Sequence, residues 1–230
     1  LIVKTGDNYN HINTYIKVAK SLKKSKKVLK IIEQLEHVKT HLEAILAQTI
    51  FRIIDHKVVK SEEKVVSIFE EHTDVIVKSR REVEFGHKIF LTTGKSNLVL
   101  DCQIEQGNPS DAIKFMDLVN AQNKLYERFP RQISADGGFS SKDNVLNAKK
   151  SGVKDVCFSK RCGLKILEIV KSSYVYNKLK KFRAGIESNI SALKRGFGLD
   201  RATWKGLSGY KSYIWSALVS YNLTILSNKV

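Results

Sequence analysis

The chain is poor in cysteine and has no long apolar run, and each shortage excludes a class of protein. Only three cysteines occur among its 230 residues: Cys102, Cys157 and Cys162. Because their number is odd and their surroundings are apolar or basic, we expect reduced thiols in a cytoplasmic protein. No apolar stretch approaches the ~20 residues that span a bilayer. The first residues lead at once into polar ones, so no secretory signal is visible.

Acidic residues are outnumbered, and this imbalance indicates a polyanionic partner. The chain has 40 lysines and arginines against 23 aspartates and glutamates, which gives a net charge of +17. Such a surplus attracts nucleic acid first, and an anionic membrane is the rival partner. Since no apolar run is long enough to span a membrane, we expect nucleic acid as the partner.

Zinc-binding patterns are missing as well. Cys157 and Cys162 have no second pair of ligands nearby in the sequence. His37 and His41 have the spacing of one helix face, but Val38 stands where a zinc protease carries glutamate. The sequence therefore does not favour a metal role for these histidines.

The first 60 residues predict a helical amino-terminal segment. Residues 1–22 are polar and weakly patterned. From residue 28 the apolar positions alternate in steps of three and four, as in a long amphipathic helix or a short coiled coil, at Val28, Ile31, Leu35, Val38, Leu42, Ile45, Thr49 and Ile53. Lysines gather on the opposite face, where they either meet DNA or face solvent. A polar joint at residues 60–63 separates this segment from a predicted domain over residues 61–230.

After residues 60–63 the spacing of apolar residues changes to that of β-strands. Residues 65–69 are apolar on both faces, which is typical of a buried central strand. Residues 82–92 alternate, residues 93–97 read as a hairpin loop, and residues 98–104 return as a third strand. Three strands without an intervening helix predict an antiparallel meander.

The second half of the chain alternates between helices and strands. A helix should begin near Asp111, and a strand should cover residues 132–135. The remaining segments are a capped helix closing at Gly152, a strand at residues 153–158, and helices at residues 164–171, around residues 183–187 and at residues 204–226. The order β-β-β-α-β-α-β-α is that of a ribonuclease H-like α/β fold, a mixed sheet with helices on both faces.

Three acidic positions suggest a catalytic site. Asp136 follows a strand and precedes two glycines, at the edge of a sheet where ligand sites gather. Glu70 ends the predicted strand at residues 65–69, and Asp74 has the same strand parity. The alternative for Asp136 is a turn residue that binds local amides.

A helical segment carries the third acid. Arg183, Glu187 and Lys194 fall within an arc of roughly 40° on a helix, and the simpler interpretation is a row of salt bridges. Glu187 would pack beside the strands that carry the other acids. Converging carboxylates repel one another unless divalent cations lie between them. Two Mg²⁺ ions about 4 Å apart, replaceable by Mn²⁺, would suit phosphodiester displacement.

Four motifs give the chain a resemblance to a known family. They are Val66-Ser67-Ile68-Phe69-Glu70-Glu71-His72-Thr73-Asp74, Val83-Glu84-Phe85-Gly86-His87-Lys88, Ala135-Asp136-Gly137-Gly138-Phe139 and Phe182-Arg183-Ala184-Gly185-Ile186-Glu187. Over residues 58–230 the sequence resembles the DDE transposases of bacterial insertion sequences. Arg183, Glu187 and Lys194 match the spacing of their Tyr-Arg-Glu-Lys signature, whereas Lys180 stands at the position of its tyrosine.

The resemblance implies a catalytic and metal-binding set of three acids. Asp136 and Glu187 would be the second and third acids. Glu70 is the first choice for the remaining acid, with Asp74 as the alternative. Arg183 and Lys194 would hold DNA phosphates near the scissile bond.

The resemblance also implies partners and a cellular setting. Family members usually act as dimers on paired DNA ends, in the bacterial cytoplasm and close to the nucleoid. They carry an amino-terminal helix-turn-helix, and residues 1–60 contain no convincing one. Together with the first residue being Leu rather than Met, this predicts a chain truncated at its amino terminus.

The expected activity is Mg²⁺-dependent cleavage and strand transfer at the ends of an insertion sequence. An alternative is a catalytically inactive remnant that only binds DNA through its charge. A third class is a cellular ribonuclease H-like nuclease. The spacing of Arg183, Glu187 and Lys194 argues against this class. Mg²⁺-dependent nicking of DNA that carries the element's ends separates these classes.

Overall fold

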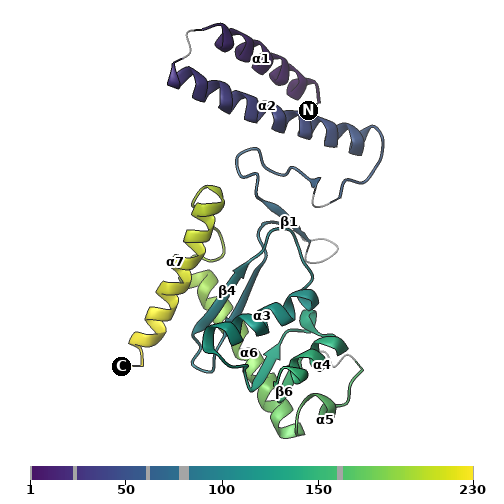
Figure 1. Ribbon diagram of the computed structural model, residues 1–230, viewed down its shortest axis with the longest axis vertical. Helices are drawn as coiled ribbons and strands as arrows, with labels where there is room; N and C mark the ends of the chain where they lie inside the picture. The colour runs from purple at the N-terminus through teal and green to yellow at the C-terminus, as the bar shows by residue number, and fades with distance from the viewer. Residues whose placement is uncertain (1, 23–24, 61–62, 78–82, 160–162, 230) are drawn as a thin grey trace. The chain divides into compact units, whose positions relative to one another are not determined.

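The computed structural model describes residues 2–22, 25–60, 63–77, 83–159 and 163–229 (Figure 1). The chain divides into two compact units, residues 1–87 and 88–230.

Two antiparallel helices form the first part of the amino-terminal unit (Figure 1). Helix α1 covers Ile2–Ser21 and α2 covers Lys26–Ile53. Ser25 caps α2 by accepting a hydrogen bond from the Val28 amide. The helices pack through buried Ile16, Ile32 and Leu42. The apolar spacing predicted α2 correctly, whereas α1 gave only a weak pattern, and Ile16 is its one buried residue among those described.

The same unit contains a short antiparallel pair of strands, β1 at Asp74–Val77 and β2 at Val83–Gly86. In this pair Asp74 lies opposite Gly86. The prediction of a buried strand at residues 65–69 is wrong, since these residues form no strand and Phe69 is 91% exposed. The Val65 amide and carbonyl instead form hydrogen bonds with the Gln48 side chain. These backbone groups are therefore satisfied without pairing to a neighbouring strand.

The carboxy-terminal unit begins with a β-hairpin. Strands β3 at Ile89–Thr93 and β4 at Val99–Ile104 pair antiparallel. The loop between them includes Asn97 with φ of +66°, a conformation that asparagine tolerates. This hairpin was predicted correctly. The strand predicted at residues 82–92 is instead divided at His87 and Lys88, so that β2 and β3 pair with different partners.

A β-α-β crossover follows the hairpin. Strand β5 at Gln132–Ala135 pairs in parallel with β6 at Asp155–Phe158, and helix α4 at Lys142–Lys150 connects them. Helix α3 at Asp111–Tyr126 packs beside α4. The buried core of this region contains Phe115, Val119, Val145, Ala148, Val153, Val156, Cys157, Phe158, Ile169, Val170, Val175 and Leu179.

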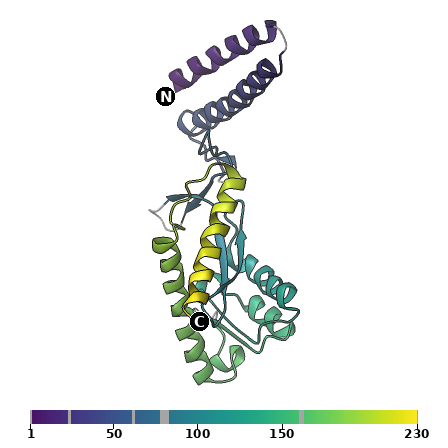
Figure 2. The same ribbon diagram turned by 90° about the vertical axis from the view of Figure 1, so that its left-hand side faces the viewer.

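Helix α6 connects this core with a second one. After the single turn of α5 at Ile166–Ile169, α6 covers Ser173–Gly196 and α7 covers Gly206–Ser227. Leu179 on α6 belongs to the core above, whereas Leu193 packs in a second cluster with β4 and α7. Figure 2 shows α7 beside the hairpin, where the Asn222 side chain makes two hydrogen bonds to the Val99 backbone.

The protein is therefore a mixed α/β structure, as expected. Among the described residues the strands form three two-stranded sheets, in the order β1-β2, β3-β4 and β5-β6, and not one continuous mixed sheet. Within the described part of the chain, no helix has the length and apolar character needed to cross a bilayer.

Two of the three cysteines lie in the described residues, and both are free thiols in the interior. Cys102 and Cys157 are buried, while Cys162 lies outside the described residues. Burial raises the pKa of the Cys102 thiol to about 12, and the negative charge of Asp101 adds to the increase. Burial likewise raises the pKa of Cys157. Both thiols are accordingly unreactive in the folded protein.

Candidate active site

Asp136 lies at the carboxyl end of the parallel strand pair. It follows β5 directly and caps a 3₁₀ turn, η2, at Gly137–Phe139. Its Oδ1 accepts hydrogen bonds from the Gly137 amide at 2.6 Å and from the Ser159 hydroxyl at 3.1 Å. Ser159 follows β6, so the ends of both strands meet at this carboxylate. The side chain nevertheless remains 68% exposed, which leaves it accessible to a ligand.

The turn after Asp136 is fixed from the opposite side. The buried Asn144 amide donates to the carbonyl oxygens of Ala112 and Phe139, each at 2.8 Å. Gly138 lies so close to Asp111 that an added Cβ would overlap the Asp111 carboxylate. Asp111 is itself held by Lys88 at 2.6 Å. The glycine at 138 is therefore explained by its contact with α3.

Arg183 on α6 brings two predicted acids together. Its Nη1 lies 3.3 Å from Oδ1 of Asp136 and 3.1 Å from Oε1 of Glu187. The two carboxylate oxygens are thus no farther apart than the sum of these distances. A hydrogen bond of 2.9 Å from the Ser134 hydroxyl to the Leu179 carbonyl helps to hold β5 against α6. The Nε of Arg183 is buried and, among the described residues, has no hydrogen-bond partner.

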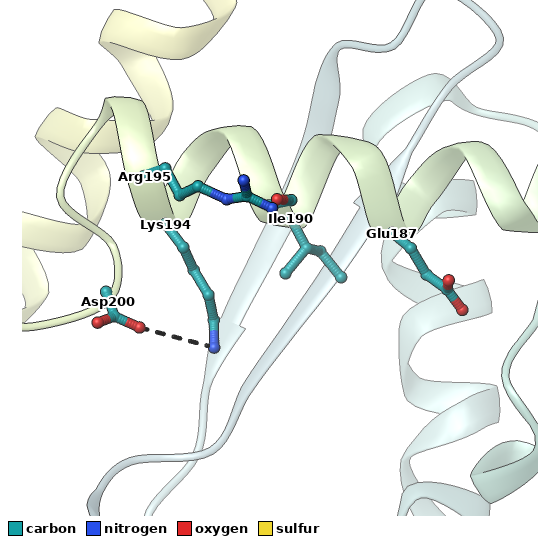
Figure 3. A pocket seen from close by; sticks show the side chains of 6 residues that line it. Glu187, Ile190, Lys194, Arg195 and Asp200 are labelled. Atoms are coloured by element: carbon teal, nitrogen blue, oxygen red, sulfur yellow. Dashed lines mark ion pairs between the residues drawn. The ribbon is translucent and has the colours of Figure 1, made fainter.

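An open groove continues from Glu187 along α6. It has a volume of about 470 Å³ and is lined by Glu187, Ile190, Ser191, Lys194, Arg195 and Asp200. Figure 3 shows Glu187 at one end and Lys194 pointing toward Asp200 at the other. The ion pair between Lys194 and Asp200 is long, at 3.9 Å. An exposed pair of this kind contributes little to stability, so the ammonium can exchange Asp200 for a phosphate.

The two candidates for the remaining acid lie in the unit of residues 1–87, and histidines bind both. Oε2 of Glu70 lies 2.9 Å from Nε2 of His72, and Oδ2 of Asp74 lies 2.9 Å from Nδ1 of His87. The two rings are joined by a 2.7 Å contact between Nδ1 of His72 and Nε2 of His87. No pattern in the sequence predicted this chain of contacts.

The reason for preferring Glu70 no longer holds. That choice depended on a strand at residues 65–69, and the described structure has none there. Asp74 opens β1, where its position is set by pairing with β2. The side chain of its partner His87 is buried, which fixes the orientation of the carboxylate.

The donor atoms at Asp136 and Glu187 suit a magnesium ion. Mg²⁺ prefers oxygen ligands and keeps several of its waters, so it needs accessible carboxylates. Both carboxylates are exposed, Glu187 by 67%, and one guanidinium already brings them together. These residues therefore fit the metal that the resemblance implies.

One of three comparisons with known proteins found a match. The family described as Transposase DDE domain matches residues 47–223, a span that includes both acids and Arg183. A search of curated proteins and a search of solved structures each gave no match. The matched span covers most of the chain. The chain therefore belongs to the transposase DDE domain family.

Proposed function

We propose that this protein catalyses DNA cleavage and strand transfer at the ends of a bacterial insertion sequence. Membership of the family indicates a transposase that acts on DNA. The observation that best supports catalysis is the shared contact of Asp136 and Glu187 with Arg183, because two acids far apart in the sequence meet at one point. The net charge of +17 supports binding to the DNA backbone.

Asp136 and Glu187 would hold the divalent ions. Two Mg²⁺ ions, or Mn²⁺ in their place, would supply activation of the attacking hydroxyl and stabilisation of the leaving oxygen. The hydrogen bonds from Gly137 and Ser159 orient the carboxylate of Asp136. Helix α6 and Arg183 orient Glu187. Both acids are therefore held in position before a ligand binds.

Arg183 has two roles in this proposal. In the free protein it neutralises the repulsion between Asp136 and Glu187. Once DNA and metal are bound, its planar guanidinium is suited to two parallel hydrogen bonds to a phosphate. Lys194 would bind a second phosphate in the groove along α6 as a point charge.

We propose Asp74 as the first acid of the set, with Glu70 as the alternative. Asp74 has the support of its position on β1 and its buried partner His87. Glu70 precedes a turn and lies outside any strand. An acid on a strand is held more precisely than one on a loop, which favours Asp74.

The order of elements supports a ribonuclease H-like catalytic domain. From β3 to α6 the chain alternates as a hairpin, a helix, and a parallel crossover closed by a helix. We propose residues 61–230 as this domain and residues 1–60 as a helical segment that precedes it. We also propose that two copies act together, because transposition joins two DNA ends, and this step is made by analogy alone.

Cleavage of DNA that carries the element's ends tests the proposal. The inverted repeats that flank the coding region would be cloned into a supercoiled plasmid, and nicking would be measured with Mg²⁺, with Mn²⁺ and with a chelator. We expect nicks at the repeats that require the divalent ion. Binding with steep salt dependence but no cleavage would indicate an inactive remnant, and cleavage of an RNA–DNA hybrid without preference for the ends would indicate a cellular nuclease.

The same assay distinguishes the two candidates for the first acid. Asp74→Asn should reduce nicking by at least ~1,000-fold, since a metal ligand is worth several kcal/mol in the transition state. Glu70→Gln should keep most of the activity. The opposite result would restore Glu70 as the first acid, and near-normal activity of both variants would exclude both residues.

Lys194→Gln should weaken the binding of all DNA sequences by a similar factor. Removing one phosphate contact should reduce the slope of log K against log salt by about 1. Lys211→Gln, at an exposed lysine on α7, is the matched control and should leave the slope nearly unchanged. Binding measured by fluorescence anisotropy over a salt series checks this. Equal slopes for the two variants would argue against a phosphate contact at Lys194.

A further inference from the structure

We propose that His37, His41 and Glu71 form a zinc-binding site in the unit of residues 1–87. The three residues offer one ligand atom each, and these atoms lie within 4.8 Å of one another. Nε2 of His37 is 2.6 Å from Oε1 of Glu71, and Nε2 of His41 is 3.2 Å from Oε2. Two histidines and one glutamate are a common ligand set for zinc with one position left for water.

The hydrogen bond at the far side of His41 determines the role of Nδ1. This atom lies 3.2 Å from the carbonyl oxygen of His37, which can only accept, so Nδ1 carries a hydrogen. The other nitrogen, Nε2, lies 3.2 Å from a carboxylate oxygen of Glu71, and either a proton on Nε2 or a metal ion bound by both atoms joins this pair. A backbone carbonyl bound to the other ring nitrogen is also the usual arrangement of a histidine that binds a metal.

The dimensions of the cluster suit zinc after a small adjustment. Zinc bonds of about 2.0–2.2 Å to nitrogen and oxygen place tetrahedral ligands about 3.4 Å apart. The described separations are within reach of this value, because His37 and Glu71 are exposed and have room to rotate. Imidazole ligands favour zinc over Mg²⁺ or Ca²⁺, which take oxygen ligands.

The segment that carries Glu71 is already held against α2. The Gln48 amide donates to the Val65 carbonyl at 2.8 Å and accepts from the Val65 amide at 3.0 Å. Gln48 contacts Val65, and two turns closer to the amino terminus of α2 His41 and then His37 contact Glu71. Zinc would fasten this segment to the helix at a second point. Val38 lies between the histidines in sequence and offers no general base, so the role of the metal would be structural.

Zinc titration of the metal-free full-length chain tests this site. Calorimetry should give one zinc per chain, and Co²⁺ in its place should give the visible absorption of a four-coordinate site. Even partners of metal ligands change affinity by 10–100-fold, so His41→Ala and Glu71→Gln should each weaken binding by at least about that factor. His11→Ala, at an exposed histidine on α1, is the matched control and should bind normally.

Two further measurements keep the result specific. Asp136→Asn should bind zinc normally, which separates this site from the proposed catalytic acids. Zinc should raise the melting temperature of the wild type and of His11→Ala but not of Glu71→Gln, whose fold is checked by circular dichroism. Absence of zinc binding by the folded wild type, or a zinc affinity in Glu71→Gln and His41→Ala equal to that of the wild type, would show that a proton alone joins these residues.

Discussion

Asp136→Asn should reduce Mg²⁺-dependent cleavage of DNA by at least about 1,000-fold, which corresponds to about 4 kcal/mol of transition-state stabilisation. The amide keeps an oxygen that can accept from Gly137 and Ser159, so the turn should keep its shape. It loses the negative charge that a magnesium ion requires. Initial rates of nicking under saturating DNA check this prediction.

The fold and the affinity for DNA should remain unchanged in this variant. Asp136 is exposed, and its ion pair with Arg183 contributes at most about 1 kcal/mol to stability. Asp117→Asn is the matched control, because it removes the same charge from another exposed aspartate that pairs with a cation, here Lys114. A similar loss of cleavage in both variants, or near-normal cleavage by Asp136→Asn, would contradict a catalytic role for Asp136.

Local signals in the sequence predicted the elements that carry this site. Strand β5 occupies the predicted residues 132–135, because Asp136 and two glycines mark its end. Helix α4 begins after Ser141, whose hydroxyl accepts from the Asn144 amide as the capping signal indicated. Such features depend on neighbours within a few residues, so periodicity and capping are sufficient to predict them.

The shared contact of Asp136 and Glu187 with Arg183 was predicted less directly. Helical spacing placed Arg183 and Glu187 on one face of α6, and the strand end placed Asp136 at a sheet edge. Only the packing of β5 against α6 brings these two predictions together, through contacts such as that of Ser134 with Leu179. The sequence supported this packing only through the predicted ribonuclease H-like order of elements and through the resemblance to a known family.

The errors occur where a distant side chain decides the local structure. Residues 65–69 have the composition of a buried strand, yet Gln48 satisfies the backbone of Val65 and no strand pairs with this segment. A short apolar run does not reveal whether a pairing partner exists. The preference for Glu70 followed from that error. The contacts of His72 with His87 and of His41 with Glu71 depend on the same irregular segment, and no periodicity predicts them.

Leu193→Ala should destabilise the carboxy-terminal unit by about 2–5 kcal/mol. Leu193 is 0% exposed and packs in one cluster with Val99 on β4 and with Leu218 on α7. Removing its side chain leaves a cavity between three elements whose positions are fixed by other contacts, so the site cannot easily collapse. Both tryptophans, Trp204 and Trp215, lie in this unit, so denaturant unfolding followed by tryptophan fluorescence reports on it alone.

The matched control is Leu223→Ala on α7, where the leucine is 60% exposed. This change should cost less than about 1 kcal/mol, because it removes little buried surface and creates no cavity. A loss of stability below 1 kcal/mol in Leu193→Ala would mean that α6 does not pack against the hairpin and α7 as described. Leu193 precedes Lys194 and lies on the same helix as Glu187. A large loss of stability in Leu193→Ala would therefore link the packing of this core to the placement of the residues proposed to act on DNA.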